Sequence, residues 1–323
     1  MKTKIKINFK DFWFPDTEEN IKSSYFFRLL STKYDLELND NPDFLIYSWF
    51  GGEFYKYDCI RIYYTGENSR PNYNECDYSF SFDYPETEKN FRLPLFRTRP
   101  EFDELHNKHQ ISKNVENDKR KFCNFLYSNK RAEKRIEFFN NLQKYRNIDS
   151  GGKVLNNLGY TIDKDINEKL KFLSEYKFTI AFENSAHPGY TTEKILHAFL
   201  SGSIPIYWGN PLVAKDFNPK SFINCHDYNN FDEVIERIIE IDNNYDLYQK
   251  YLNEPALSEN EENKYLNEQN ILDKFEQIFM HKNVARVSRK TDILKYYYYN
   301  ILQAKKYTRR KFRRIIRIKN QLF

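Results

Sequence analysis

One stretch of the chain, FENSAHPGYTTEKILHAFLSGSIPIYWG (residues 182–209), carries two pairs of polar residues between apolar runs. Glu183 and Asn184 follow an apolar run that predicts a strand, and Glu193 and Lys194 begin a run with helical spacing. In an open parallel sheet, ligands bind beyond the carboxyl ends of strands, where loops lead into helices. These four residues therefore define a candidate ligand-binding loop.

Lys194 is the unusual member of this group. The N-terminal end of a helix is partially positive, which favours Glu193 but opposes a lysine at the next position. A bound phosphate would remove this conflict, because helix N-terminal amides and an ammonium group hold phosphate together. The alternative is a lysine that extends into water. We expect Gly189 to permit the turn that precedes the helix and Thr191 to cap it.

Four cations follow a second predicted strand at residues 121–129. They are Lys130, Arg131, Lys134 and Arg135. An arginine at the carboxyl end of a strand can bind a diphosphate through two parallel hydrogen bonds. The alternative is an ordinary solvated helix face. Arg131 and Arg135 are both candidates for the diphosphate contact.

Glu67 is the candidate acid in the first half of the chain. The segment YYTGEN (63–68) places it just after an apolar strand, preceded by Gly66. A carboxylate that faces a cleft from this position can act as a general base, although many glutamates after glycine are surface turns. A second acidic motif, Asp-Lys-Asp at 163–165, matches the Asp-x-Asp of metal-using sugar transferases. It lies in a polar stretch, which favours a chance match.

Predicted strands and helices alternate in two series along the chain. The first series has strands at 4–9, 43–50, 59–68 and 78–82 and a helix at 19–32. The second has strands at 121–129, 176–184 and 203–209 and helices at 131–145, 191–201 and 231–242. A polar segment, 102–121, separates the two series. Strand–helix–strand units of this length predict parallel sheets, and therefore an α/β protein with two domains and a cleft between them.

The composition of the chain limits the class of protein that it can form. A chain of 323 residues, 40% of them hydrophobic, can build two domains. No run approaches the ~20 apolar residues of a membrane span, and charges interrupt the first residues too often for a signal peptide. The four cysteines lie far apart, which argues against a zinc site or a disulfide framework and predicts reduced thiols.

The charge is distributed unevenly. Residues 281–323 contain fourteen Lys and Arg and one acid, so this tail carries +13 and the first 280 residues carry −8 of the net +5. Near the end of the tail, Phe312, Ile315, Ile316, Lys319 and Phe323 recur at helical spacing and would form one stripe that is apolar except for Lys319. A basic amphipathic helix is typical of attachment to an anionic membrane surface. A solvated disordered tail and nucleic-acid binding are compatible alternatives.

These motifs together resemble those of the α1,3/4-fucosyltransferases of glycosyltransferase family 10, and they are especially similar to the bacterial Lewis-antigen enzymes of the Helicobacter type. Residues 182–209 resemble the donor-binding signature of that family, and residues 210–233 continue the match. YYTGEN, FRLPLF (91–96) and GGKVLNNLGY (151–160) also fit. The resemblance spans roughly residues 40–280. It implies a GT-B architecture, in which two Rossmann-like domains face each other across a cleft.

The resemblance also implies roles for the parts of the chain. Residues 1–117 would bind the acceptor, residues 118–280 would bind GDP-fucose, and 281–323 would form a basic membrane-associating tail. Glu67 falls on the catalytic base. The implied donor contacts are Arg135, Asn184, Tyr190, Glu193 and Lys194, with Arg131 close enough to keep the diphosphate assignment open.

The implied reaction is an inverting transfer of L-fucose from GDP-β-L-fucose to the GlcNAc hydroxyl of an N-acetyllactosamine-type glycan. No metal is expected to be essential and no nucleic-acid partner is expected. The implied location is cytoplasmic, peripheral on the inner face of the membrane, because acceptors of similar bacterial enzymes are lipid-linked. Two rivals remain open: a GT-B transferase that uses another nucleotide sugar, and a non-catalytic glycan- or membrane-binding protein of the same fold.

Overall fold

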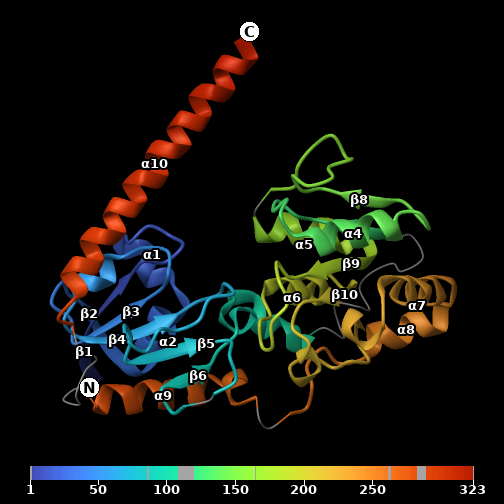
Figure 1. Ribbon diagram of the computed structural model, residues 1–323. Coiled ribbons are helices and arrows are strands. Elements are labelled where there is room, and N and C mark those ends of the chain that lie inside the picture. Colours follow the sequence, from blue (N-terminus) through green and yellow to red (C-terminus); the bar gives the residue numbers. More distant parts are fainter. Residues whose placement is uncertain are drawn as a thin grey trace.

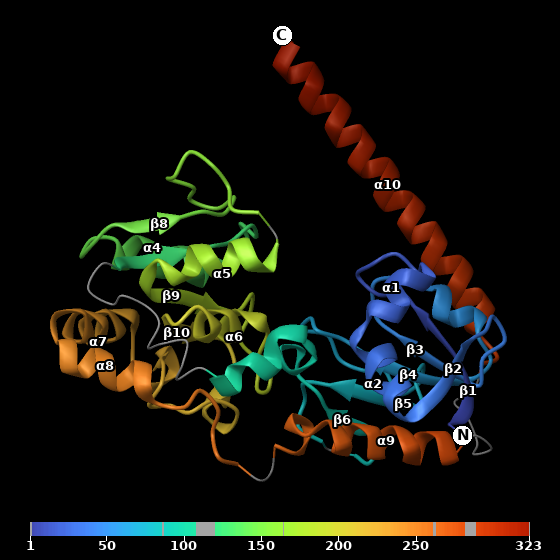
Figure 2. The ribbon, with the colours of Figure 1, turned by 180° about the vertical axis from the view of Figure 1, so that it is seen from behind.

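Two parallel β-sheets form the body of the protein (Figure 1). The computed structural model describes residues 2–85, 87–107, 120–163, 165–260, 263–281 and 289–322, without the side chains of 308–322. Each sheet lies in its own half of the molecule, with helices packed around it, and a long helix leaves the first half (Figure 2). The predicted α/β class is therefore confirmed.

The first sheet has six strands in the order β2-β1-β3-β4-β5-β6, all parallel. Their bounds are β1 Thr3–Lys10, β2 Tyr34–Leu38, β3 Phe44–Tyr47, β4 Ile60–Tyr64, β5 Tyr78–Ser81 and β6 Asn90–Arg92. The four strands predicted for this half are confirmed as β1, β3, β4 and β5. Strands β2 and β6 were not predicted, because both are short and carry charged residues.

The single helix predicted at 19–32 is two helices in the structure. They are α1 (Glu18–Ser23) and α2 (Tyr25–Lys33). Ser24 separates them, because its backbone is extended and its hydroxyl accepts a hydrogen bond from the backbone N–H of Phe27. Serine competes with the helix for backbone groups in this way, so it favours caps over helix interiors.

The second sheet has five parallel strands in the order β11-β10-β9-β7-β8. They are β7 Lys121–Phe125, β8 Ile148–Ser150, β9 Tyr176–Phe182, β10 Ile204–Trp208 and β11 Ile223–Asn224. Its helices are α4 Glu133–Leu142, α5 Ile166–Ser174, α6 Glu193–Leu200, α7 Phe231–Asn243 and α8 Tyr245–Asn253. The three predicted helices are confirmed as α4, α6 and α7. The chain order reverses between β7 and β9, so this pair is the topological switch point of the sheet.

Helix α9 (Glu268–Met280) returns to the first sheet after the second is complete. Its Phe275 stacks on Phe80 at a ring-centroid distance of 4.4 Å, and Phe279 lies 4.6 Å from Phe44. Figure 2 shows α9 running beside β6, along the edge of the first half. The division at residues 118–280 would group α9 with the second sheet, but its apolar face completes the core of the first.

Contacts between the halves fix their relative position. Arg92 of β6 forms an ion pair with Asp216 at 2.7 Å, and both side chains are buried. Asp216 also accepts a hydrogen bond from the hydroxyl of Tyr265. Phe96 and Phe217 pack together beside this pair, with ring centroids 4.8 Å apart. A buried ion pair with additional hydrogen bonds demands a specific geometry, so the two sheets meet in one arrangement.

Helix α10 (Asp292–Leu322) starts on the first half and then projects away from the body (Figure 1). Asp292 forms a buried ion pair with Arg61 of β4 at 2.8 Å, and the hydroxyl of Tyr296 donates to Glu53. The predicted helix in the tail is confirmed and begins earlier than expected. The predicted stripe from 312 to 323 lies outside the described side chains. Among the described residues, no helix has the length and apolarity needed to cross a bilayer.

Candidate functional site

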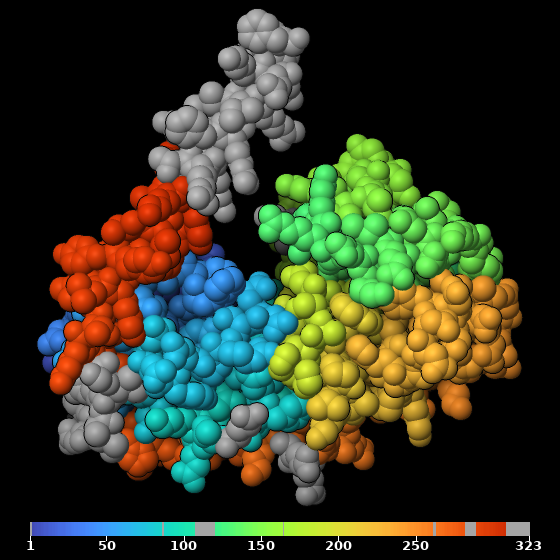
Figure 3. Space-filling view, viewed as in Figure 1, coloured from blue at the N-terminus to red at the C-terminus, as the bar shows by residue number. Residues whose placement is uncertain are grey.

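A cavity of about 260 Å³ lies between the two halves of the molecule. Figure 3 shows that the surface is hollowed between the first half (blue and cyan) and the second (green and yellow). The catalytic base and the five donor contacts that the family resemblance implies all line this cavity. They are Glu67, Arg135, Asn184, Tyr190, Glu193 and Lys194. The fold therefore brings together residues that are up to 127 positions apart in the chain.

The sheet topology explains this position. Residues 126–129 follow β7 and Asn184 follows β9, and both segments line the cavity. The two strands are neighbours in the sheet, yet their following connections lead away in opposite directions. A crevice opens where connections diverge in this way, and open α/β sheets bind their ligands there. Glu67 approaches from the other half, at the carboxyl end of β4.

Lys194 has protein counter-charges, which the sequence analysis did not expect. Its ammonium lies 3.0 Å from a carboxylate oxygen of Glu183 and 3.6 Å from one of Glu193. The side chain is 16% exposed, so the alternative of a lysine extended into water is wrong. Glu183 and Glu193 raise the pKa of Lys194 above its ordinary value although burial lowers it. A bound phosphate is therefore not needed to explain a lysine at this position.

Glu183 organises the loop, although the sequence assigned it no contact of its own. Its fully buried carboxylate accepts hydrogen bonds from the backbone N–H and the hydroxyl of Thr192 and from Lys194. Thr192 occupies the N-cap position of α6, so the prediction that Thr191 caps this helix is wrong. The Thr191 hydroxyl instead accepts a hydrogen bond from the side chain of Asn210. Two carboxylates thus hold the ammonium of Lys194 at the cavity wall.

Arg135 is the buried arginine of the site. Its Nη2 donates to the carbonyl oxygen of Phe182 at 2.6 Å and to Asn184 at 3.1 Å, and its guanidinium lies 3.6 Å from the ring centroid of Tyr127. Among the described residues, its Nε and Nη1 have no hydrogen-bond partner. Buried donors of this kind call for an acceptor, and an anion in the cavity would supply one. Arg131 is exposed and does not line the cavity, so the geometry favours Arg135 for the diphosphate contact.

Gly189 and Tyr190 hold the loop against the first half. Gly189 has a φ of +84°, and a Cβ atom at this position would lie 2.2 Å from the carbonyl oxygen of Phe82. Only glycine permits both the conformation and the approach. Tyr190 is buried, with its ring centroid 5.1 Å from that of Phe82. Asn68 adds a hydrogen bond to Ser185 at 2.7 Å, so the loop is positioned relative to Glu67 as well as to its own sheet.

Lys169 is a further cation of the cavity that the sequence analysis missed. It comes from α5, and its ammonium lies 2.7 Å from Nδ1 of His197, whose Nε2 lies 2.6 Å from Glu101. Burial lowers the pKa of Lys169. Burial alone would raise the pKa of Glu193, but Lys194 and Lys169 hold it well below its ordinary value. Glu193 is therefore a carboxylate that can accept hydrogen bonds from ligand hydroxyls.

Glu67 differs from the other acids of the site. Burial raises its pKa above the ordinary glutamate value, and the nearby Lys194 opposes this shift. The backbone is held closely here, because the N–H of Glu67 donates to the Thr65 hydroxyl and a Cβ at Gly66 would lie 2.7 Å from Leu95. A carboxylate with a raised pKa is better suited to accept a proton near neutral pH.

The described residues contain no group of three or more His, Cys, Asp and Glu arranged to hold a metal ion. Of the Asp-x-Asp motif, Asp165 is the N-cap of α5 and accepts hydrogen bonds from two backbone N–H groups. The chance interpretation of that motif agrees with this structural role. All four cysteines are buried.

Comparison with known proteins identifies the family of the chain. Residues 7–98 match the family model of the N-terminal domain of the α-(1,3)-fucosyltransferase FucT. Residues 116–295, more than half of the chain, match the C-terminal model of glycosyltransferase family 10 (fucosyltransferase). The chain belongs to glycosyltransferase family 10. The resemblance inferred from the motifs is therefore confirmed.

Two relatives define the extent of the sequence similarity. The α-(1,3)-fucosyltransferase FucT of Helicobacter pylori is 35% identical over 298 residues, which cover 79% of this chain and 60% of FucT. The human 4-galactosyl-N-acetylglucosaminide 3-α-L-fucosyltransferase 9 is 36% identical over 121 residues, or 37% of this chain and 32% of that enzyme. The chain thus spans 60% of the length of the first relative and about a third of the second.

A crystal structure of an α1,3-fucosyltransferase with GDP-fucose superimposes with a TM-score of 0.74 and 33% identity, covering 86% of this chain and 91% of that one. The match extends over both sheets. The predicted GT-B-like architecture is therefore confirmed.

Proposed function

We propose that this family 10 member transfers L-fucose from GDP-β-L-fucose to the GlcNAc hydroxyl of an N-acetyllactosamine-type glycan. The observation that carries the proposal is the shared cavity, in which Glu67 of one half lies opposite Arg135 and Lys194 of the other. The lactosamine acceptor is supported by the human relative, whose name specifies a 4-galactosyl-N-acetylglucosaminide. The donor is supported by the similar crystal structure with GDP-fucose.

The proposed mechanism is a single displacement. Glu67 takes the proton of the acceptor hydroxyl while the hydroxyl oxygen forms a bond to C1 of fucose. The bond from C1 to the diphosphate oxygen breaks on the opposite face, and GDP leaves, so a β-linked donor gives an α-linked product. Negative charge grows on the diphosphate in the transition state. Arg135 and Lys194 stabilise this charge more strongly there than in the ground state, which accelerates the reaction.

Incubation with GDP-fucose and several lactosamine acceptors tests the proposal, with the product linkage assigned by NMR. We expect an α1,3-fucosylated product, and we expect the same product in the presence of EDTA because side-chain cations neutralise the diphosphate. A panel of other nucleotide sugars distinguishes the first rival, which would transfer a different sugar. Absence of product from every donor would support a non-catalytic binding protein and overturn the proposal.

We further propose that helix α10 attaches the protein to the inner, cytoplasmic face of an anionic membrane. Leu294, Tyr298 and Ile301 lie at helical spacing and are 67%, 63% and 52% exposed. Residues 305–323 add nine Lys and Arg and no acid. An amphipathic helix of this composition lies in the membrane interface, and each cation near the surface contributes about 1 kcal/mol.

Truncation after Ala304 tests this attachment. The shortened chain keeps Asp292 and Tyr296, whose contacts hold the start of α10 on the first half. We expect it to remain folded and to lose binding to anionic liposomes in a sedimentation assay, whereas the full chain should bind and be released by salt. Equal binding by the two forms would overturn the membrane proposal.

A further inference from the structure

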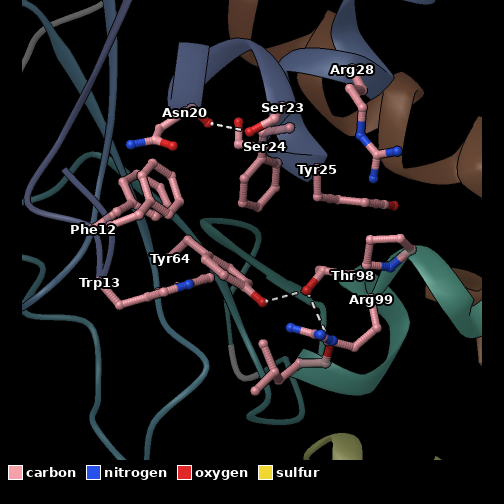
Figure 4. A pocket seen from close by; sticks show the side chains of 14 residues that line it. Phe12, Trp13, Asn20, Ser23, Ser24, Tyr25, Arg28, Tyr64, Thr98 and Arg99 are labelled. Carbon is pink, nitrogen blue, oxygen red and sulfur yellow. Dashed lines mark hydrogen bonds between the residues drawn. The ribbon is translucent and has the colours of Figure 1, made fainter. Parts of the chain in front are cut away.

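A second cavity, of about 210 Å³, lies within the first half of the molecule. Figure 4 shows its walls: Asn20, Ser23 and Tyr25 lie on one side, with Arg28 above Tyr25, and Trp13, Tyr64, Thr98 and Arg99 lie on the opposite side. The walls come from the loop after β1, from α1 and α2, and from the carboxyl end of β4. Among the described lining residues, Leu95 alone also lines the first cavity.

The second cavity adjoins the site of Glu67. Leu95 lines both cavities. Tyr64 is the last residue of β4, and Glu67 follows it by three positions in the chain. The hydroxyl groups of Tyr64 and Thr98 are hydrogen-bonded at 3.0 Å (Figure 4). The Thr98 hydroxyl also donates to the carbonyl oxygen of Leu95, so these contacts fix this wall of the cavity. The two cavities are therefore neighbours, with Leu95 in the wall of each.

Trp13 gives the cavity an aromatic face that is both exposed and held in place. The side chain is 49% exposed. Four neighbouring rings contact it at tilted or edge-on angles, with centroid distances between 5.5 and 6.3 Å. They are Phe12, Phe14, Phe50 and Tyr64. An aromatic ring fixed in this way binds an apolar ligand face at little conformational cost.

The rest of the lining is mixed: Phe12, Phe14 and Phe26 add apolar surface, and polar side chains lie along one side. Asn20, Ser23 and Arg28 supply hydrogen-bond donors and acceptors at the side of the cavity that faces Trp13. A pyranose ring has the complementary surface, because its C–H groups form apolar faces and its hydroxyl groups form a polar edge. An acyl chain would use the aromatic face but could form no hydrogen bonds with these polar groups, whereas the hydroxyl groups of a sugar could. The lining therefore fits a sugar better than a lipid chain.

We propose that this cavity is the subsite for a pyranose of the acceptor glycan, adjacent to the sugar that receives fucose, with its face stacked on Trp13. The inference rests on the proposed function, because it takes Glu67 as the base that receives the acceptor. Donor and acceptor then occupy different walls: the donor lies on the second half, with Arg135 and Lys194, and the acceptor extends over the first half toward Trp13.

Kinetics of Trp13→Ala test the subsite, with Trp49→Ala as the matched control. Trp49 lies in the same half, is 50% exposed and does not line the cavity. We expect Trp13→Ala to raise the KM for a lactosamine-containing oligosaccharide by roughly tenfold, the size of one lost aromatic contact. The KM for GDP-fucose and the acceptor-independent hydrolysis of GDP-fucose should not change. Trp49→Ala should leave all three values unchanged.

Equal acceptor KM values for the two variants would overturn the subsite. If Trp13→Ala does not fold, Trp13→Phe and Asn20→Ala provide the same comparison, and both should raise the acceptor KM. A direct titration of each protein with the oligosaccharide, followed by tryptophan fluorescence, measures binding without turnover. If the wild-type protein neither transfers nor hydrolyses GDP-fucose, the proposed function fails. A quench of tryptophan fluorescence by the oligosaccharide that is present in the wild-type protein and lost in Trp13→Phe would still support a glycan subsite. Absence of this quench in the wild-type protein would overturn the subsite.

Discussion

Replacing Glu67 with Gln should lower kcat by ~10²–10⁴-fold while the affinity for GDP is retained. A positioned general base contributes this factor, and the amide of Gln cannot accept the proton of the acceptor hydroxyl. The substitution preserves size and hydrogen bonding, so the cavity should keep its shape. Turnover with saturating donor and acceptor measures kcat, and calorimetric titration measures GDP affinity. Near-normal turnover would remove Glu67 from the role of base.

The pH profile gives an independent reading of the same residue. A base acts only when it is deprotonated, so kcat/KM should fall as the pH drops through the pKa of Glu67. Burial raises that pKa, which places the acidic limb above the ordinary range of a glutamate. In Glu67→Gln this limb should be absent from the residual activity. Persistence of the limb in the variant would assign it to another group.

The sequence could predict the loop at residues 183–194 because its signals are local. An apolar run ending at Glu183, a glycine, and a helical run beginning at Glu193 together place a strand–loop–helix unit, and the structure has β9, Gly189 and α6 in these positions. The parallel sheet then explains why Arg135 meets Asn184: β7 and β9 are neighbours, so the segments that follow them share one edge. Local pattern and sheet topology were sufficient for this part of the site.

Other features depend on contacts that no local pattern encodes. Lys169 lies in a polar stretch, and its relation to the cavity follows from the packing of α5 beside α6. The return of α9 to the first sheet is likewise a long-range choice, because its apolar face would suit either core. The position of Lys194 likewise cannot be explained from the dipole of its own helix, because the ammonium is paired with Glu183 at the end of the preceding strand. A buried partner eleven residues away changed the physical account of the lysine.

Replacing Lys194 with Ala should lower the free energy of unfolding by about 3–5 kcal/mol and also weaken GDP binding. Glu183 is fully buried, and its carboxylate would lose the ammonium 3.0 Å away. Breaking one side of a buried ion pair leaves an uncompensated charge, and this cost accounts for most of the expected loss. Urea denaturation measures the first effect. A loss below about 1 kcal/mol would mean that Glu183 does not depend on Lys194.

The affinity loss alone would not show that Lys194 contacts phosphate, because an unpaired Glu183 could distort the loop. The double variant Glu183→Gln, Lys194→Met separates the two causes. It removes both charges together, so stability should return to within about 1–2 kcal/mol of the wild-type protein, as replaced buried pairs are often nearly neutral. GDP affinity should remain low if the ammonium binds the diphosphate. Recovery of GDP affinity together with stability would make Lys194 a structural counter-ion of Glu183 and leave the diphosphate to Arg135.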